Sequence, residues 1–318
     1  MTSLGARLLT GNAAPFAPQK GADWLALAAE RGNAEACAQM AVLAGAGVCR
    51  PQRWDMALDY LQRAAERGSE SAQAQLALLA TDRPHLPPGD DPAFGGPDRW
   101  LRLRRAIDVD AWIAARPKES LSEAPRIRTI ENFASAAVCD WLIERARGKL
   151  GRARTYDVET GEGIVGESRT NSETDFNIVE SDLVLILLRA RIAAATDLPP
   201  AVFELTKVLH YAVGQRFAPH FDFIDPATKG FAGELEARGQ RLATFLVYLN
   251  DDYEGGETEF KAIGLRHRGR RGDALLFANV DLAGNPDRRT LHAGLPPTRG
   301  EKWVLSQWIR DRTPAVRA

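Results

Sequence analysis

Residues 211–224 read YAVGQRFAPHFDFI, and this stretch carries the pattern His220-Phe221-Asp222. Side chains at positions i and i+2 of a strand point to the same side, so His220 and Asp222 are predicted to share one face. A lone His292 follows later in the chain, and Lys302 comes ten residues after it. Two imidazoles and one carboxylate can hold iron(II) while leaving coordination positions open on one face of the metal. The three residues therefore indicate a metal centre that could activate O2.

A His-x-Asp pattern alone is a weak signal, because most such pairs are surface or hydrogen-bonded pairs. Here the surrounding sequence strengthens it, since short apolar stretches separated by glycine-rich turns lie between the two histidines. A lysine after the second histidine also supplies a fixed cation that could hold an acidic co-substrate. The supporting motifs are Tyr248-Leu249-Asn250, Gly255-Gly256-Glu257-Thr258, Gly272-Asp273-Ala274 and Gly300-Glu301-Lys302-Trp303.

The composition is that of an ordinary soluble globular protein. The 318 residues are 45% apolar and 26% charged, and the formal net charge is −1. This balance favours neither nucleic acid nor a membrane as a partner, and no apolar run is long enough to span a bilayer. Three cysteines are too few and too scattered for a disulfide framework or a zinc site. Because the first residues lack an apolar signal segment, a cytoplasmic location is expected.

The first third of the chain contains an internal repeat. Ala28-Ala29-Glu30-Arg31-Gly32 returns 36 residues later as Ala64-Ala65-Glu66-Arg67-Gly68. Both glycines stand where a helix C-terminal cap is expected, and the apolar spacing before and after them predicts two helices per repeat. This stretch resembles the Sel-type repeats, which are relatives of the tetratricopeptide repeat. Residues 1–82 are therefore predicted to form an α-helical repeat domain, either a platform for a protein partner or a cap that stabilises the enzyme.

Residues 83–98 are rich in proline and glycine and are predicted to be a linker. Residues 99–318 would then form the second domain. Helices are predicted over residues 136–147 and 181–195, the latter amphipathic, to brace one outer face of a β structure. Short strands broken by glycine and proline are typical of a jelly-roll or barrel. These strands are predicted at residues 205–213, 221–224, 242–249, 258–260, 274–277 and 303–309.

Residues 124–312 resemble the prolyl 4-hydroxylase family of iron(II)- and 2-oxoglutarate-dependent dioxygenases. The resemblance rests on the motifs above and on Ser168-Arg169-Thr170-Asn171-Ser172, which fits the segment that covers the site. It implies an α+β fold with a double-stranded β-helix (jelly-roll) catalytic domain and bracing helices. It also implies hydroxylation of an unactivated C–H bond, with O2 and 2-oxoglutarate consumed and succinate and CO2 released.

The resemblance also implies roles for individual residues. His220, Asp222 and His292 would hold Fe(II). Lys302 would form a salt bridge to the distal carboxylate of 2-oxoglutarate, and Tyr211 and Thr258 would hydrogen-bond the same carboxylate. Ascorbate could serve as an additional reductant. From residue type alone, Tyr211 could instead be a core aromatic residue, and Thr258 could be a strand former after a turn.

The candidate substrate residues are Arg241, Trp308 and Arg169, although a structural ion pair is an equal alternative for Arg241. The favoured activity is prolyl 4-hydroxylase-type hydroxylation of a peptide or protein. One alternative is hydroxylation of a free amino acid or small metabolite. Another is a non-catalytic binding module in which the repeats act, but the intact ligand set argues against it.

Two features depart from the family pattern. Phe217 stands where many members have tyrosine, which removes one polar contact near the co-substrate or substrate. The segment GLRHRGRR, residues 264–271, is unusually basic. Its arginines could be exposed charges on a strand edge, or they could bind an acidic partner. Both departures concern the substrate and leave the metal ligands untouched.

Overall fold

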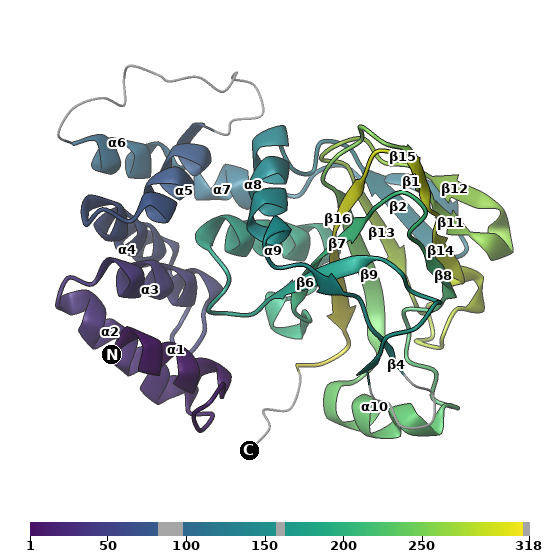
Figure 1. The fold of residues 1–318 in the computed structure, drawn as a ribbon, viewed down its shortest axis with the longest axis horizontal. Helices are drawn as coiled ribbons and strands as arrows, with labels where there is room; N and C mark the ends of the chain where they lie inside the picture. Colours follow the sequence, from purple (N-terminus) through teal and green to yellow (C-terminus); the bar gives the residue numbers. More distant parts are fainter. Residues whose placement is uncertain (82–97, 157–162, 314–318) are drawn as a thin grey trace. The chain divides into compact units, whose positions relative to one another are not determined.

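The computed structural model describes residues 1–81, 98–156 and 163–313, so nearly all of the predicted linker lies outside the described residues. One compact unit consists of residues 1–115 and 176–200, and a second consists of residues 116–175 and the chain from residue 201 onward (Figure 1). The units therefore do not follow chain order, and a domain division at residues 83–98 remains a prediction. No helix in the described ranges has both the length and the apolar character needed to cross a bilayer.

The first unit is helical. Its helices are α1 (Thr2–Thr10), α2 (Pro18–Glu30), α3 (Ala34–Ala46), α4 (Trp54–Glu66), α5 (Glu70–Thr81), α6 (Arg99–Ala106), α7 (Val109–Ile113) and α9 (Leu183–Thr196). The pairs α2–α3 and α4–α5 are the two helical hairpins that the repeat predicts. Gly32 and Gly68 follow the first helix of each hairpin with φ of 88° and 85°. This left-handed conformation closes a helix C-terminus without strain when the residue is glycine, which confirms the predicted caps.

Helix α9 belongs to the helical unit, although strand β6 (Ser172–Phe176) of the other unit precedes it in the chain. Six consecutive residues from Leu183 to Leu188 are buried, so the predicted amphipathic character is wrong. A helix that is apolar on all sides must be covered on all sides. Helices α3, α5 and α7 contact α9, and the Gln75 side chain of α5 accepts a 2.9 Å hydrogen bond from the Leu183 N–H. The repeat helices thus supply part of this cover.

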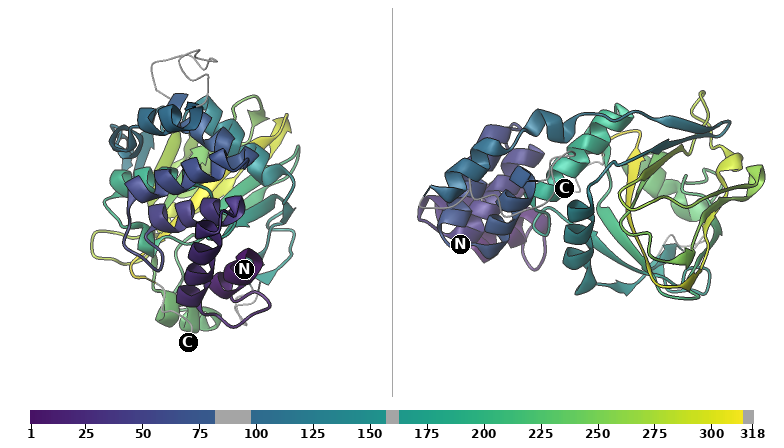
Figure 2. Two further views of the ribbon diagram at one scale, coloured as in Figure 1. Left: turned by 90° about the vertical axis from the view of Figure 1, so that its left-hand side faces the viewer. Right: turned by 90° about the horizontal axis from the view of Figure 1, so that it is seen from above.

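The second unit contains two main antiparallel sheets with helices α8 (Ala136–Arg147) and α10 (Ala232–Arg238). The larger sheet has the order β1 (Glu119–Glu123), β2 (Arg126–Ile130), β13 (Ala274–Ala278), β9 (Arg241–Tyr248), β16 (Lys302–Arg310), β7 (Thr206–Tyr211), β6 and β3 (Gly151–Arg152). The smaller sheet has the order β12 (Leu265–His267), β11 (Thr258–Phe260), β14 (His292–Gly294) and β8 (Phe217–His220). Two short pairs complete the unit, β4 (Thr155–Tyr156) with β5 (Gly163–Ile164) and β10 (Glu254–Gly255) with β15 (Pro297–Arg299). The two main sheets face each other as in a jelly-roll (Figure 2).

An apolar cluster within this jelly-roll contains side chains from both sheets and packs the two sheets together. Its buried members are Ile127, Tyr248, Phe260, Leu275, Phe277 and Val304. The structure confirms the predicted strands that became β7, β9, β11, β13 and β16. The prediction of a strand at residues 221–224 is wrong, because the strand in this region, β8, ends at His220. Pro219 is tolerated in β8 because this strand is last in the order of its sheet and Pro219 is exposed.

The basic segment forms contacts within the protein. Arg266 pairs with Glu259 at 2.7 Å, and Arg268 donates to the carbonyl oxygen of Asp251 at 2.8 Å. Arg271 donates to the carbonyl oxygen of Ala136 at 2.6 Å. These contacts support the interpretation of exposed structural charges over that of a site for an acidic partner.

Candidate active site

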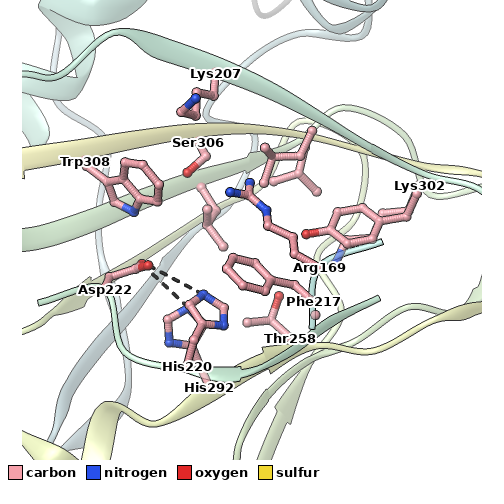
Figure 3. Close-up of a pocket in the computed structure, with 15 residues that line it drawn as sticks. Arg169, Lys207, Phe217, His220, Asp222, Thr258, His292, Lys302, Ser306 and Trp308 are labelled. Atoms are coloured by element: carbon pink, nitrogen blue, oxygen red, sulfur yellow. Dashed lines mark ion pairs between the residues drawn. The ribbon is translucent and has the colours of Figure 1, made fainter. Parts of the chain in front are cut away.

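The fold brings the three predicted metal ligands together. His220 is the last residue of β8, Asp222 follows two residues later, and His292 is the first residue of β14. Because β14 pairs with β8 so that His292 lies opposite His220, residues far apart in sequence become neighbours. One ligand atom from each residue lies within 4.8 Å of the others. Each histidine Nε2 is 3.5 Å from a different oxygen of Asp222 (Figure 3).

Backbone carbonyls orient both imidazoles. Nδ1 of His220 is 2.8 Å from the carbonyl oxygen of Ala218, and Nδ1 of His292 is 2.9 Å from that of Thr290. A carbonyl oxygen can only accept, so Nδ1 of each ring must carry the proton. The lone pair of each neutral ring is therefore on Nε2, which faces Asp222 and is available to a metal.

Hydrogen bonds also hold the carboxylate. The Thr244 hydroxyl of β9 donates to Asp222 Oδ2 at 2.6 Å, and Asn279 Nδ2 donates to Thr244 Oγ1 at 3.0 Å. Burial alone would raise the pKa of Asp222, but the imidazoles of His292 and His220 outweigh it and hold that pKa below its usual range. Burial, together with the neighbouring His220 ring, lowers the pKa of His292 to about 4. Near neutral pH these groups therefore have the protonation states that a metal requires.

This donor set fits iron(II). Two imidazole nitrogens and one carboxylate oxygen converge from one side, which leaves the opposite side of a bound ion free for other ligands. Asp222 and His292 are buried, with 3% and 6% of their surfaces exposed. Two of the three ligands are therefore shielded from bulk water, whereas His220 is partly exposed.

Lys302 lies at the other end of the same pocket. It is the first residue of β16, and its backbone pairs with Tyr211 at the end of β7. Its Nζ donates to the carbonyl oxygen of Gly256 at 2.6 Å and lies 5.4 Å and 5.5 Å from the ring centres of Tyr211 and Tyr248. The residue is 3% exposed and forms no ion pair with the described residues. Burial lowers its pKa to about 7, so an incoming carboxylate would relieve an uncompensated charge.

Tyr211 and Thr258 line the pocket close to this lysine. Tyr211 is 4% exposed, and burial raises its pKa to about 12, so its hydroxyl remains a hydrogen-bond donor. Thr258 begins β11, and its Oγ1 lies 3.0 Å from the Tyr248 hydroxyl. The structure thus brings Lys302, Tyr211 and Thr258 together as predicted, and their role in holding a carboxylate stays a prediction.

Comparisons with known proteins agree with this geometry. Residues 206–310 match the family model of the 2OG-Fe(II) oxygenase superfamily. The chain is 36% identical over 240 residues to Probable prolyl 4-hydroxylase 9 of Arabidopsis thaliana, which covers 70% of this chain and 81% of that protein. The chain belongs to the prolyl 4-hydroxylase family. As a prolyl 4-hydroxylase-type dioxygenase it uses Fe(II) and 2-oxoglutarate, for which the pocket has a matching ligand set.

Solved structures similar to parts of this prolyl 4-hydroxylase family member include two of different kinds. The viral collagen prolyl hydroxylase of Paramecium Bursaria Chlorella virus-1, in complex with 2-oxoglutarate, has 28% identity and a TM-score of 0.44, covering 57% of this chain and 94% of that one. A Sel1 repeat protein from Oxalobacter formigenes has 23% identity and a TM-score of 0.26, covering 35% of this chain and 44% of that one.

The three candidate substrate residues differ in their surroundings. Trp308 lines the pocket, and its buried Nε1–H has no hydrogen-bond partner among the described residues. Arg169 also lines the pocket, but its guanidinium bonds to Glu173 at 2.6 Å and to the Arg154 carbonyl oxygen at 2.9 Å. Arg241 does not line the pocket. It pairs with Glu204 at 2.6 Å and stacks 3.7 Å from the Trp308 ring centre. The structural ion pair, one of two alternatives for Arg241, is thus present.

The sequence interpretation assigned no role to some residues of the prolyl 4-hydroxylase pocket. The Phe217 ring stacks on His220 with centroids 3.4 Å apart, and Arg169 covers its other side at 4.4 Å. Lys207 lines the pocket four residues before Tyr211 on β7. Strand alternation from Tyr211 would have placed Lys207 on this wall. The stack on His220 has no comparable sequence signal, because residues 217 and 220 lie three apart in a strand.

Proposed function

We propose that this protein hydroxylates a prolyl residue in a peptide or protein, with His220, Asp222 and His292 as metal ligands and Lys302 as the anchor for 2-oxoglutarate. One observation carries the proposal. A single pocket has a three-ligand metal site at one end and a buried lysine without a carboxylate partner in the described chain at the other. A dicarboxylate that bridges a cation at each end suits this arrangement.

With O2 as the oxidant, bound Fe(II) and 2-oxoglutarate would supply the chemistry that converts an unactivated C–H bond to an alcohol. The residues of the chain position the reactants. The carbonyl oxygens of Ala218 and Thr290 fix the imidazole tautomers, and Thr244 fixes the plane of the Asp222 carboxylate. At the other end, the Lys302 ammonium and the Tyr211 hydroxyl would donate to the distal carboxylate, where burial strengthens each charge-assisted hydrogen bond.

The charge balance of the pocket supports a peptide substrate. Lys207 is bound to Asp175 at 2.5 Å and to Glu173 at 3.3 Å, and Glu173 also binds Arg169. Among the described lining residues, Lys302 is thus the cation without a carboxylate partner. The carboxylate of a free amino acid would need a second such cation. A prolyl residue within a peptide has no free carboxylate and needs no such cation. The Trp308 Nε1–H can donate a hydrogen bond to a main-chain carbonyl oxygen of the peptide.

The experiment is a comparison of peptide products by mass spectrometry. Proline-containing peptides are incubated with the protein, iron, ascorbate, O2 and 2-oxoglutarate, in parallel with free amino acids. We expect a 16 Da gain (one oxygen atom) on a prolyl residue, with succinate formed in equal amount. Succinate formation with oxidised free amino acids and unmodified peptides would contradict the peptide proposal. An unchanged rate in an Asp222→Ala protein would contradict the metal site.

We propose further that the repeat helices stabilise the enzyme by covering α9, with partner recruitment as the alternative. The support is that α3 and α5 both contact α9, whose residues lie in the chain between β6 and β7. Deletion of residues 1–81 is expected to give insoluble protein or a lower melting temperature, because it exposes apolar surface of α9. A deletion protein with unchanged melting temperature and unchanged kinetics on short peptides would instead favour recruitment.

A further inference from the structure

Tyr248 lies directly behind the lysine end of the pocket. It is the last residue of β9, is fully buried and does not line the pocket. Its hydroxyl is 3.0 Å from Thr258 Oγ1, and its ring centre is 5.5 Å from Lys302 Nζ. A single side chain thus contacts two of the groups proposed to hold the distal carboxylate.

Proton counting decides the direction of the hydrogen bond between the two hydroxyl groups. A carboxylate only accepts hydrogen bonds, and a threonine hydroxyl has one proton. If Thr258 donates this proton to a carboxylate, then Thr258 Oγ1 must accept the bond from Tyr248. Burial raises the pKa of Tyr248 far above its usual value. The phenol therefore stays protonated near neutral pH, and it can act as this donor.

We infer that Tyr248 is a positioning residue that donates to Thr258 Oγ1 and thereby directs the Thr258 proton at the distal carboxylate of 2-oxoglutarate. The inference rests on the proposed role of Thr258. Without the phenol proton, Thr258 could turn its own proton towards Tyr248 and present only lone pairs to the carboxylate. Tyr248 thus acts on the co-substrate through Thr258, without touching it.

The neighbouring backbone leaves the Tyr248 ring little freedom. Gly269 is buried against it, and a Cβ at position 269 would lie 2.1 Å from Tyr248 Cδ2. No other residue therefore fits at position 269 without displacing the ring. The same ring has its centre 5.5 Å from Lys302 Nζ and its hydroxyl 3.0 Å from Thr258 Oγ1, so a displaced ring would change the surroundings of both anchoring groups. A glycine in the basic segment thus serves the lysine end of the pocket.

The test compares Tyr248→Phe, Thr258→Val and the double variant. The readout is the dissociation constant of 2-oxoglutarate for Zn(II)-loaded protein, measured by calorimetry in the absence of turnover. We expect each single substitution to weaken binding roughly tenfold, as for loss of one hydrogen bond to a charged group. The double variant should bind about as weakly as Thr258→Val, because both changes remove the same contact. A 2-oxo acid without the distal carboxylate should bind all proteins equally.

Tyr253→Phe is the matched control, because it removes a buried hydroxyl in the same region that makes no bond to Thr258. It should leave the dissociation constant unchanged. If Thr258→Val binds 2-oxoglutarate more weakly but Tyr248→Phe binds it like wild type, the inference about Tyr248 is wrong and the proposed role of Thr258 stands. Additive effects in the double variant would lead to the same conclusion. Wild-type binding by Thr258→Val would overturn the proposed role of Thr258 together with the inference. Melting temperatures within a few degrees of wild type would exclude misfolding.

Discussion

The two ends of the pocket differ in how their charges are compensated. At the metal end, both oxygens of Asp222 face an imidazole, and Thr244 adds a hydrogen bond. At the lysine end, the partners of Lys302 within the described ranges are a carbonyl oxygen and two aromatic rings. The metal end has lone pairs that can bind a cation, whereas the lysine end has a cation that can bind an anion. The metal end thus needs a cation and the lysine end needs an anion. A metal ion with a bound dicarboxylate would supply both.

The largest effect is expected at the metal end. Asp222→Ala removes the one anionic ligand, so metal affinity should fall by more than about 100-fold, beyond the loss typical of an outer contact. Equilibrium dialysis with Zn(II) as a redox-inert ion measures this. Asp225→Asn is the control, because Asp225 lies three residues away and pairs with Arg288 at 2.9 Å. Equal metal binding by Asp222→Ala and Asp225→Asn would show that the triad is not the metal site.

The second effect concerns the lysine end. Lys302→Met should weaken 2-oxoglutarate binding on the order of 100-fold, because it removes one partner of a buried charge pair. Metal affinity should stay unchanged. Burial depresses the pKa of Lys302, so the ammonium destabilises the folded protein, and the variant should melt at a higher temperature.

Lys207→Met is the control that sharpens the comparison. Lys207 lines the same pocket but already pairs with Asp175 and Glu173, so its loss should change 2-oxoglutarate affinity by less than about threefold. A loss as large as that of Lys302→Met would mean that the resident ion pairs do not decide which lysine binds the co-substrate.

The local sequence pattern predicted the residues at the lysine end of the pocket better than it predicted how the ligands at the metal end come together. Side chains six residues apart in a strand share a face, so the strand predicted at residues 303–309 is consistent with the finding that Lys302 and Trp308 of β16 both line the pocket. The His-x-Asp pattern named two ligands, although it was assigned to a strand that ends at His220. Only the pairing of β14 with β8 shows how His292 reaches the site. Family motifs thus supplied residue identities, and the structure supplied the contacts between distant segments.

Features that depend on non-local contacts could not be predicted in this way. Residues 181–195 are predicted from the sequence to form an amphipathic helix, whereas in α9 even the guanidinium of Arg191 is buried, against the Trp112 carbonyl oxygen. For Arg241 the sequence left a substrate contact and a structural ion pair open, and only the structure shows that Glu204, 37 residues earlier, pairs with it. The Phe217 ring stacks on His220, although simple alternation along β8 would place residues 217 and 220 on opposite faces. Each of these requires the tertiary structure.

A smaller effect should appear in the support of the carboxylate. Thr244→Val keeps the shape of the side chain but removes the hydroxyl that bonds Asp222 at 2.6 Å. Metal affinity should fall about tenfold, at the lower end of what such outer contacts contribute. 2-Oxoglutarate binding to the metal-saturated protein should not change. Metal affinity equal to wild type would show that the imidazoles alone orient the carboxylate.

The last expected effect is a pH dependence of the lysine end. The pKa of Lys302 in the free protein is about 7, and a bound carboxylate must raise it. Below this pKa the ammonium is present in both states, so affinity for 2-oxoglutarate should be constant. Above it, binding must first take up a proton, so the dissociation constant should rise by up to about tenfold per pH unit. Calorimetry between about pH 6.5 and pH 8.5 measures this, and a flat profile would contradict the buried, uncompensated lysine.

The most direct test of the account is a crystal structure of the protein with Zn(II) and 2-oxoglutarate, grown without O2. We expect the metal about 2.0–2.2 Å from Nε2 of His220, Nε2 of His292 and one oxygen of Asp222. We expect the distal carboxylate about 2.7–2.9 Å from Lys302 Nζ. A metal held by other residues, or a distal carboxylate that points away from Lys302, would contradict the account.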